Sequence, residues 1–594
     1  MCTVSDAIEK ARRFLDKERV FRLGELLTES SHPKTRALSQ TIGADIGAGI
    51  RMLQSVDEEI PPIAAKVFQE DAFRDLIAAF VGALNCGRRI FFTGCGATGR
   101  LSILLEAAWR RFWRQLKANH ADLAAKAPDM ENSTFSVMAG GDFALIKSVE
   151  GFEDFPQFGR YQLEQAGIQA GDVVVAITEG GETPFVIGTA WQGLDAGAQV
   201  FFVYNNPTEV LVRHVERSRQ VVEEPRIKKL DLATGPMAIT GSTRMQAVTI
   251  ELLVVGCALE TALVQFLRQV LTARDWARLG LRIRPAEDYH RHFVDMLSQL
   301  SAPSAVDAMA RATQFEENIY RRDSLITYAA DSALLDALTD TTERSPTFMV
   351  PPFRKHGDDR SPQSWAFVKN PFLSTARAWG DMLQRQPRGL DWPADVYRKL
   401  NAPLTLQAEP PRLDNTEIYK FMTGNEPDPS RSSVPESVLA VIAIGDKTDD
   451  LIRNSLERCG TDYRRTAAII IGEPAAASHT DELFQFSCDL PDSPLQLWHH
   501  LGTKLVLNTI STATMVRMGR VVGNAMVWLS PSNKKLIDRG SRLISQVAKC
   551  SYEQACIELH RTMEEVQFRS QQGEEVPSPV ALAIERIVAE RGKS

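Results

Sequence analysis

Three short segments carry the residue types best suited to chemistry, and each joins an apolar run to a helical pattern. They are Thr-Gly-Cys-Gly-Ala-Thr-Gly-Arg at 93–100, Thr-Glu-Gly-Gly-Glu-Thr at 178–183 and Thr-Gly-Ser-Thr-Arg at 240–244. Small residues allow an anion to approach the backbone N–H groups of a helix N-terminus, where the helix dipole also favours negative charge. Hydroxyl groups add further donors. The segments therefore predict a site for a phosphate group or for sugar hydroxyls.

The loop residues that we expect to bind a ligand come from all three segments. They are Gly94, Gly96, Ala97, Thr98, Gly99, Arg100, Thr178, Glu179, Gly180, Gly181, Thr183, Thr240, Gly241, Ser242 and Thr243. The first segment does not fit a nicotinamide cofactor, because its glycines are one residue short of the dinucleotide spacing. We expect no cofactor. The histidine pairs near 290 and 499 lack a cysteine or acid at a metal-ligand spacing, so we expect no metal site.

The elements that position these segments are strand-length apolar runs, each followed by helical periodicity. This alternation is typical of parallel strands joined by crossover helices. The first set of predicted strands is 89–93, 134–138, 172–178, 199–204 and 227–232. The second set is 324–329, 347–351, 364–368, 437–444 and 465–471. Prolines at 285 and 303 mark the boundary between the two sets.

No strand is predicted after about residue 495, where the helical patterns are 495–519, 533–550, 551–567 and 579–591. The predicted fold is therefore α/β, with two doubly wound parallel-sheet domains and a helical C-terminal cap. We expect an N-terminal helical segment at 1–60, a first domain at 61–284, a second domain at 285–497 and the cap at 498–594. The proline-rich stretch 401–414 is predicted to be a surface loop.

Composition places the chain among folded globular proteins. Of its 594 residues, 44% are hydrophobic and 24% are charged, and the net charge of −7 provides no basic field to attract nucleic acid. Eight cysteines without a CxxC pair favour a reducing cytoplasm. The first twenty residues lack the apolar core of a signal peptide. The apolar stretch 251–267 contains two glutamates, so we expect a buried helix and no membrane partner.

Two further motifs, Met-Ala-Gly-Gly-Asp at 138–142 and Val-Glu-Gly-Phe-Glu-Asp at 149–154, make the pattern specific. Together with the three loops they resemble the sugar isomerase (SIS) domain of the family of glucokinase regulatory protein and N-acetylmuramic acid 6-phosphate etherase. The run at 503–524 is similar to the helical signature of that family. Two SIS-type domains and a cap resemble the longer regulatory protein. The resemblance covers most of the chain and implies sugar phosphate binding at the first domain.

The etherase reaction that the resemblance implies requires a base for an acidic C–H and an acid for the departing oxygen. The resemblance assigns Glu153 to one family carboxylate, with Glu150 as a nearby alternative ligand-binding residue. Counting from Gly94, the second family carboxylate falls on Ala108. Glu106 is two residues away, which rotates it by roughly 200° around a helix. This departure argues against an active lyase.

The second domain shows the opposite pattern. Glu343 stands in the family context Glu-Arg-Ser-Pro-Thr-Phe, whereas the preceding strand ends without glycines and with Asp331, which should repel phosphate. The resemblance to the double-domain protein implies that Glu343 and Lys504 reach over to sugar bound at the first domain. The predicted site is therefore composite. If the protein is an enzyme, the resemblance makes Glu153 and Glu343 its catalytic residues.

The function that we expect from the sequence is a non-catalytic sensor of a hexose phosphate of the fructose phosphate type. The resemblance suggests that it signals to a partner such as a sugar kinase, although no segment identifies a surface for that partner. Two enzymatic alternatives stay open. One is the etherase, a carbon–oxygen lyase, and the other is an aldose–ketose isomerase with Glu153 as the base.

Overall fold

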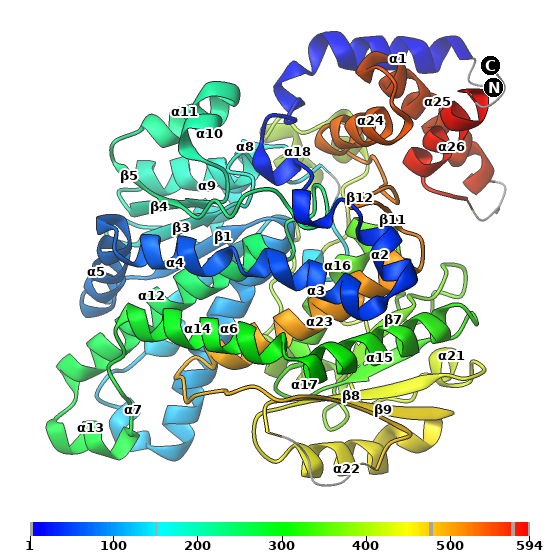
Figure 1. Cartoon of the computed structure of the whole chain (residues 1–594). Helices are drawn as coiled ribbons and strands as arrows, with labels where there is room; N and C mark the ends of the chain where they lie inside the picture. The colour runs from blue at the N-terminus through cyan, green and yellow to red at the C-terminus, as the bar shows by residue number, and fades with distance from the viewer. Residues whose placement is uncertain (1–3, 150, 474–478, 572–575, 592–594) are drawn as a thin grey trace.

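The computed structural model describes residues 4–149, 151–473, 479–571 and 576–591. It contains two five-stranded sheets in which every neighbouring pair of strands is parallel (Figure 1). The first sheet has the order β2-β1-β3-β4-β5, formed by β1 (Ile90–Gly94), β2 (Thr134–Met138), β3 (Val173–Ile177), β4 (Gln199–Tyr204) and β5 (Ile227–Asp231). All five strands predicted for this domain are confirmed.

The strands of the first sheet are apolar because helices cover both of its faces. Every residue of β1 and β3 is buried, as expected for a parallel sheet between two helical layers. Figure 1 shows α9 on one side of this sheet and α4, α5 and α12 on the other. The helices of this domain are α5 (Asp71–Asn85), α6 (Gly96–Asn119), α7 (Ala121–Ala124), α8 (Pro156–Gln165), α9 (Pro184–Asp195), α10 (Thr208–His214), α11 (Glu216–Glu223), α12 (Gln246–Val270) and α13 (Ala273–Leu279).

Helix α12 contains the most apolar stretch of the chain. It is long and apolar enough to cross a membrane, but 94% of its most apolar window is buried inside the protein. Its glutamates have polar partners: Asn205 Nδ2 donates to Glu251 at 2.8 Å, and the Tyr289 hydroxyl donates to Glu260 at 2.8 Å. The predicted buried helix is confirmed.

The second sheet has the order β10-β9-β8-β6-β7. Its strands are β6 (Ile326–Ala329), β7 (Ala366–Lys369), β8 (Val438–Ile444), β9 (Arg465–Ile471) and β10 (Glu482–Phe486). The surrounding helices are α14 (Ala286–Leu300), α15 (Pro303–Tyr320), α16 (Leu334–Phe348), α17 (Thr375–Met382), α18 (Ala394–Lys399), α19 (Leu404–Ala408), α20 (Asn415–Ile418), α21 (Pro429–Ser432), α22 (Thr448–Cys459) and α23 (Leu497–Arg517). The two doubly wound sheets that the sequence predicts are therefore both present.

Four local predictions were wrong. The predicted strand 347–351 does not form, because α16 continues through Pro346 to Phe348 and Met349 ends it in the left-handed region. Strand β10 was missed because it is a partly exposed edge strand with no continuous apolar run. The predicted loop 401–414 contains the short helix α19. The C-terminal region, predicted to lack strands, contains the small antiparallel pair β11 (Val521–Val522) and β12 (Ala525–Met526), which turns at Gly523.

Helices from both domains pack together between the two sheets. Helix α6 contacts α12 and α16, and α23 contacts α12, α15 and α16 (Figure 1). The cap consists of α24 (Lys534–Ala548), α25 (Tyr552–Gln571) and α26 (Pro579–Arg591). The N-terminal helices are α1 (Val4–Lys17), α2 (Leu38–Ala44), α3 (Ile46–Asp57) and α4 (Ile60–Phe68). Helix α1 packs against α25. The two ends of the chain therefore form one layer (Figure 1).

Helices α8 and α9 cross at two glycines, and this crossing positions two of the candidate site loops. A Cβ atom on Gly188 would lie 2.0 Å from the Pro156 carbonyl oxygen, and one on Gly159 would lie 2.0 Å from the Phe185 carbonyl oxygen. A side chain at either glycine would therefore force the backbone of the facing helix to move. The Phe185 N–H also donates to the carbonyl of Glu153 at 3.0 Å, so the crossing ties Glu153 to the start of α9.

We expect Gly188→Ala to lower the free energy of unfolding by about 1–3 kcal/mol, because the methyl group overpacks a contact with backbone. The matched control is Gly82→Ala in α5, where nothing lies within 4 Å of the added Cβ. That change should leave stability equal or raise it by up to about 1 kcal/mol through helix propensity. Thermal unfolding of both variants tests the expectation, and an unchanged melting temperature for Gly188→Ala would contradict it.

Candidate functional site

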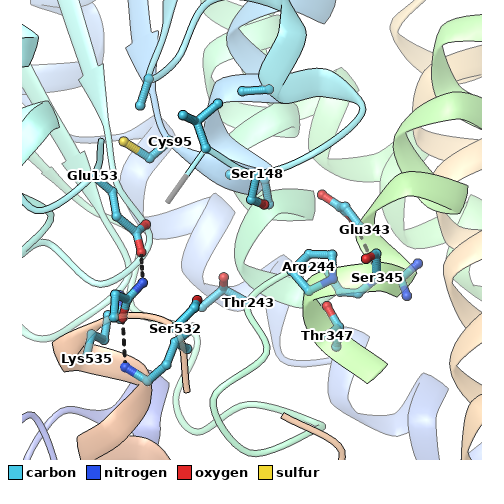
Figure 2. A pocket seen from close by; sticks show the side chains of 18 of the residues that line it. Cys95, Ser148, Glu153, Thr243, Arg244, Glu343, Ser345, Thr347, Ser532 and Lys535 are labelled. Atoms are coloured by element: carbon cyan, nitrogen blue, oxygen red, sulfur yellow. Dashed lines mark hydrogen bonds and ion pairs between the residues drawn. The ribbon is translucent and has the colours of Figure 1, made fainter. Parts of the chain in front are cut away.

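A cavity of about 340 Å³ lies where the carboxyl ends of β1 and β3 meet α16 of the second domain and the start of α24 of the cap (Figure 2). Ligands of open α/β sheets bind at this end of the strands. Residues from both domains and from the cap line the cavity. Its volume suits a small, polar ligand such as a hexose phosphate.

The first wall is the start of α6. Cys95 is the N-cap residue, and Gly96 has φ +54°, a left-handed value that favours glycine. Thr98 does not face the cavity: its hydroxyl donates to the Cys95 carbonyl at 2.9 Å and accepts from the Cys95 N–H at 3.1 Å. Ala97 and Arg100 line the cavity beside Gly96. This wall therefore presents to the cavity the backbone at the N-terminus of α6 and the guanidinium group of Arg100.

Two glycines of the first segment are needed for packing rather than for ligand contact. A Cβ on Gly94 would lie 2.5 Å from the Thr98 carbonyl carbon, and one on Gly99 would lie 2.5 Å from the Met138 side chain. Neither glycine lines the cavity. Their role is to close the turn between β1 and α6.

The second wall is the loop between β3 and α9, where Glu179 and Thr183 line the cavity. The Thr178 hydroxyl is paired with the Thr183 hydroxyl at 3.0 Å and is buried. Burial raises the pKa of Glu179 to about 6. Glu182 turns away: burial alone would raise its pKa, but Lys535 and Arg217 outweigh burial and hold it at about 2. Gly180 and Gly181 shape the loop without lining the cavity.

The third wall is the loop before α12. Gly241, Ser242, Thr243 and Arg244 all line the cavity, and the Thr243 hydroxyl donates to Glu179 at 3.0 Å. Thr240 does not line it, because its N–H donates to the Asn524 carbonyl at 2.9 Å. Gly241 has φ +79°, and a Cβ there would lie 2.6 Å from Arg539.

Glu153 enters the cavity from the turn before α8, where the cap meets the first domain. Its Oε1 accepts a hydrogen bond of 2.6 Å from Asn533 Nδ2, and Asn533 is the N-cap residue of α24. Burial, followed by the charge of Glu153, raises the pKa of neighbouring Asp154 to about 7. Glu150, the predicted alternative, lies outside the described residues.

Glu343 reaches the same cavity from α16 of the second domain. Its side chain is 6% exposed, and its Oε2 lies 3.4 Å from Arg244 Nε. Figure 2 shows Glu153 and Glu343 on opposite sides of the cavity. The structure thus brings the two predicted catalytic carboxylates to one space, although they lie 190 residues apart in the sequence.

Lys504 lies behind this cavity rather than in its wall. It lines a smaller space of about 40 Å³ together with Arg100 and Glu343. Its Nζ donates to the Arg244 carbonyl and, at 2.6 Å, to Asn508 Oδ1. Burial lowers the pKa of Lys504 to about 8. Contact between this lysine and a ligand stays a prediction.

Glu106 points away from the cavity, as helix geometry predicts. Ala108 does not line the cavity. Glu106 is fully buried, where it pairs with Arg385 at 3.1 Å and with Arg388 at 2.7 Å. The Ser136 N–H also donates to Glu106. Glu106 therefore stabilises contact between the domains and is not a substitute for the lost acid.

Several cavity residues were missed by the sequence reasoning. Arg244 ends the third segment, but it was not among the residues that we expected to bind the ligand. Its Nη2 contacts Asp340 and Ser511, whereas its buried Nη1 has no hydrogen-bond partner among the described residues. Asn533 and Lys535 lie in the cap, 289 residues or more after the loops, so no local pattern linked them to the site. Among the described residues, no group of three or more histidine, cysteine or acidic side chains could hold a metal ion.

Cys95 reports on the electrostatics of the cavity. Burial, and then the charges of Glu153 and Glu179, raise the pKa of its thiol well above the usual value. We expect iodoacetamide at neutral pH to modify Cys95 at least about tenfold more slowly than the exposed Cys86, because only the thiolate reacts. Peptide mapping by mass spectrometry measures both rates in one sample. Faster modification of Cys95 than of Cys86 would contradict the raised pKa of the Cys95 thiol.

Comparisons with known proteins agree with this architecture. Residues 75–193 match the family model described as the glucokinase regulatory protein N-terminal SIS domain. N-acetylmuramic acid 6-phosphate etherase 1 of Bacillus licheniformis is 28% identical over 249 residues, which are 41% of this chain and 70% of the relative. The N-acetylmuramic acid 6-phosphate etherase of Rippkaea orientalis is 32% identical over 229 residues, which are 38% of this chain and 64% of the relative.

One solved structure among those similar to this chain is the C-terminal domain of glucosamine-fructose-6-phosphate aminotransferase from Francisella tularensis. It shares 12% identity, and the match covers 78% of this chain and 95% of that chain with a TM-score of 0.43. A TM-score of this size supports no conclusion about function.

Proposed function

We propose that this chain is a carbon–oxygen lyase that cleaves the lactyl ether of N-acetylmuramic acid 6-phosphate, because residues 75–193 match an SIS-domain model and curated relatives are named N-acetylmuramic acid 6-phosphate etherases. The observation that carries the proposal is that Glu153 and Glu343 line one cavity from opposite sides (Figure 2). The sequence favoured a non-catalytic sensor because Ala108 stands where the first domain should supply an acid. In the proposed lyase the acid is Glu343 of the second domain, which lines the cavity.

The chemistry of the substrate requires two acid–base groups. In the open-chain sugar, the C2 proton is acidic because it lies next to the C1 aldehyde, and the lactyl oxygen is bonded to C3. A base removes the C2 proton, the C3–O bond breaks, and an acid protonates the departing oxygen. Water then adds its hydroxyl to C3, and a proton returns to C2. The net products are lactate and the hexosamine phosphate.

The geometry suits Glu153 as the base and Glu343 as the acid. Asn533 holds one carboxylate oxygen of Glu153 by a hydrogen bond of 2.6 Å, which orients the group from the cap side. Glu343 projects from the opposite wall beside Arg244, whose guanidinium lies 3.4 Å away. The cations Arg244 and Arg100 are placed to stabilise negative charge that develops on the substrate between the two carboxyl groups.

The phosphate of the substrate is best placed at the start of α6. Gly96 and Ala97 line the cavity there, and the first N–H groups of a helix have no partner within the helix. Ser242 and Thr243 offer hydroxyl donors from the loop before α12. With the phosphate at this end, the reacting carbons of the sugar lie between Glu153 and Glu343.

The second candidate is the non-catalytic sensor of a hexose phosphate. One observation favours it, which is that residues 75–193 match the N-terminal domain of a regulatory protein. The paired carboxylates and the names of the curated relatives favour the lyase instead. A sugar kinase partner stays a prediction from the resemblance.

We expect the purified protein to release lactate from N-acetylmuramic acid 6-phosphate. Glu153→Gln and Glu343→Gln should each lower kcat by about 100-fold to about 10,000-fold, because each removes one proton-transfer group but keeps its size. The matched control is Asp331→Asn at the end of β6, a carboxyl that does not line the cavity. A coupled lactate assay measures all four proteins, and the control should keep the full rate.

Two results would contradict the proposal. Saturable binding of the substrate without lactate release, measured by calorimetry on the same sample, would favour the sensor. Lactate release that survives Glu343→Gln unchanged would show that the second domain contributes no acid.

A further inference from the structure

The cavity contains a third carboxyl group, Glu179, that the proposed reaction does not use. It stands at the carboxyl end of β3, two residues beyond the last residue of that strand. Strands β1 and β3 are hydrogen-bonded neighbours, and neighbouring strands lie about 5 Å apart. Glu179 therefore lies beside the start of α6, the place that the proposed function assigns to phosphate. The raised pKa of Cys95, to which Glu179 contributes, agrees with this placement.

Glu179 has a hydrogen-bond partner but no ion-pair partner among the described residues. The Thr243 hydroxyl donates to it at 3.0 Å. The nearest cation of the cap, Lys535, is already bound to Glu182 at 2.6 Å. The charged and titratable groups that line the cavity with Glu179 are Cys95, Glu153, Glu343, Arg100, Lys147, Arg244, Lys535 and Arg539. The charge of Glu179 also acts on Glu251 of α12. Three of these cations, Lys535, Arg539 and Arg244, are already paired with Glu182, Glu29 and Asp340.

The same cavity is also built to receive an anion. Arg244 is 3% exposed, lines the cavity, and keeps its buried Nη1 without a hydrogen-bond partner among the described residues. An anionic phosphate at the start of α6 and an ionised Glu179 would repel each other. A proton between them changes the repulsion into a short, charge-assisted O–H···O hydrogen bond.

We propose that Glu179 couples sugar phosphate binding to proton uptake, by taking one proton from solvent and donating it in a hydrogen bond to a phosphate oxygen of the ligand. This inference rests on the proposed function only in requiring that a sugar phosphate occupies the cavity. Glu179 then acts as a specificity-determining residue. It disfavours ligands whose anionic group cannot accept that hydrogen bond.

The direction of the pH dependence follows from the raised pKa of Glu179, which burial sets at about 6. At pH 7.5 the carboxyl group of the free protein is therefore mostly ionised. A bound phosphate raises the pKa of Glu179 further, since like charges disfavour ionisation. Binding consequently takes up a proton, and affinity increases as the pH falls from 8 towards 6.

Calorimetric titration with N-acetylglucosamine 6-phosphate at pH 7.5 tests the inference without turnover. Measuring the binding enthalpy in buffers of different ionisation enthalpy gives the number of protons taken up. The wild-type protein should take up more than about half a proton beyond the value for Glu179→Gln. Because the free ligand titrates identically in both experiments, the difference reports on the proton that Glu179 and the bound phosphate share.

Asp154→Asn is the matched control. Asp154 is a second carboxyl group with a raised pKa near the site, but it does not line the cavity, so this variant should keep the wild-type proton uptake. Equal uptake by wild type and Glu179→Gln, or uptake lost in Asp154→Asn instead, overturns the inference while leaving the proposed lyase intact. Absence of binding to wild type overturns both proposals.

A second measurement does not depend on any variant. Uptake of half a proton to one proton makes the association constant of the wild-type protein rise about threefold to tenfold as the pH falls from 8 to 7. An association constant that stays flat over this range overturns the inference.

Discussion

The buried ion pair between Arg244 of the first domain and Asp340 of the second is the contact on which the composite cavity depends. Ser511 and Asn508 of α23 each donate a hydrogen bond of 2.8 Å to the same carboxylate. Buried charges are stable only when they are fully paired, so the two domains can approach in few arrangements. Glu343 lies one turn of α16 beyond Asp340, so this arrangement points its side chain into the cavity of the first domain.

In the proposed lyase, the first domain supplies the phosphate loops and the second domain supplies the acid. The first domain retains the glycine-rich turn at Gly96 but has Ala108 where an acid is expected, and Glu106 serves the domain interface. The second domain has Asp331 instead of a phosphate loop but keeps Glu343. Because the domains are covalently joined, each can lose what the other supplies. The cap completes the enclosure through the hydrogen bond from Asn533 to the Glu153 carboxylate.

Much of the fold could be predicted from the sequence, because buried parallel strands are continuous apolar runs. The failures have physical causes. The run at 347–351 has the composition of a strand, but packing of α16 between the domains continues the helix through Pro346. In the site, sequence reasoning identified the loops and the composite origin of the carboxylates. It could not predict that Thr98 caps α6 or that Lys504 lies behind the wall, because side-chain direction depends on tertiary packing.

The most direct test of the account is a crystal structure of the protein with N-acetylglucosamine 6-phosphate bound. The composite site predicts that the sugar lies between Glu153 and Glu343, in contact with both carboxyl groups, with its phosphate at Gly96 and Ala97. A sugar held only by residues of the first domain, with Glu343 still paired to Arg244 and out of reach, would contradict the central claim that two domains share one site.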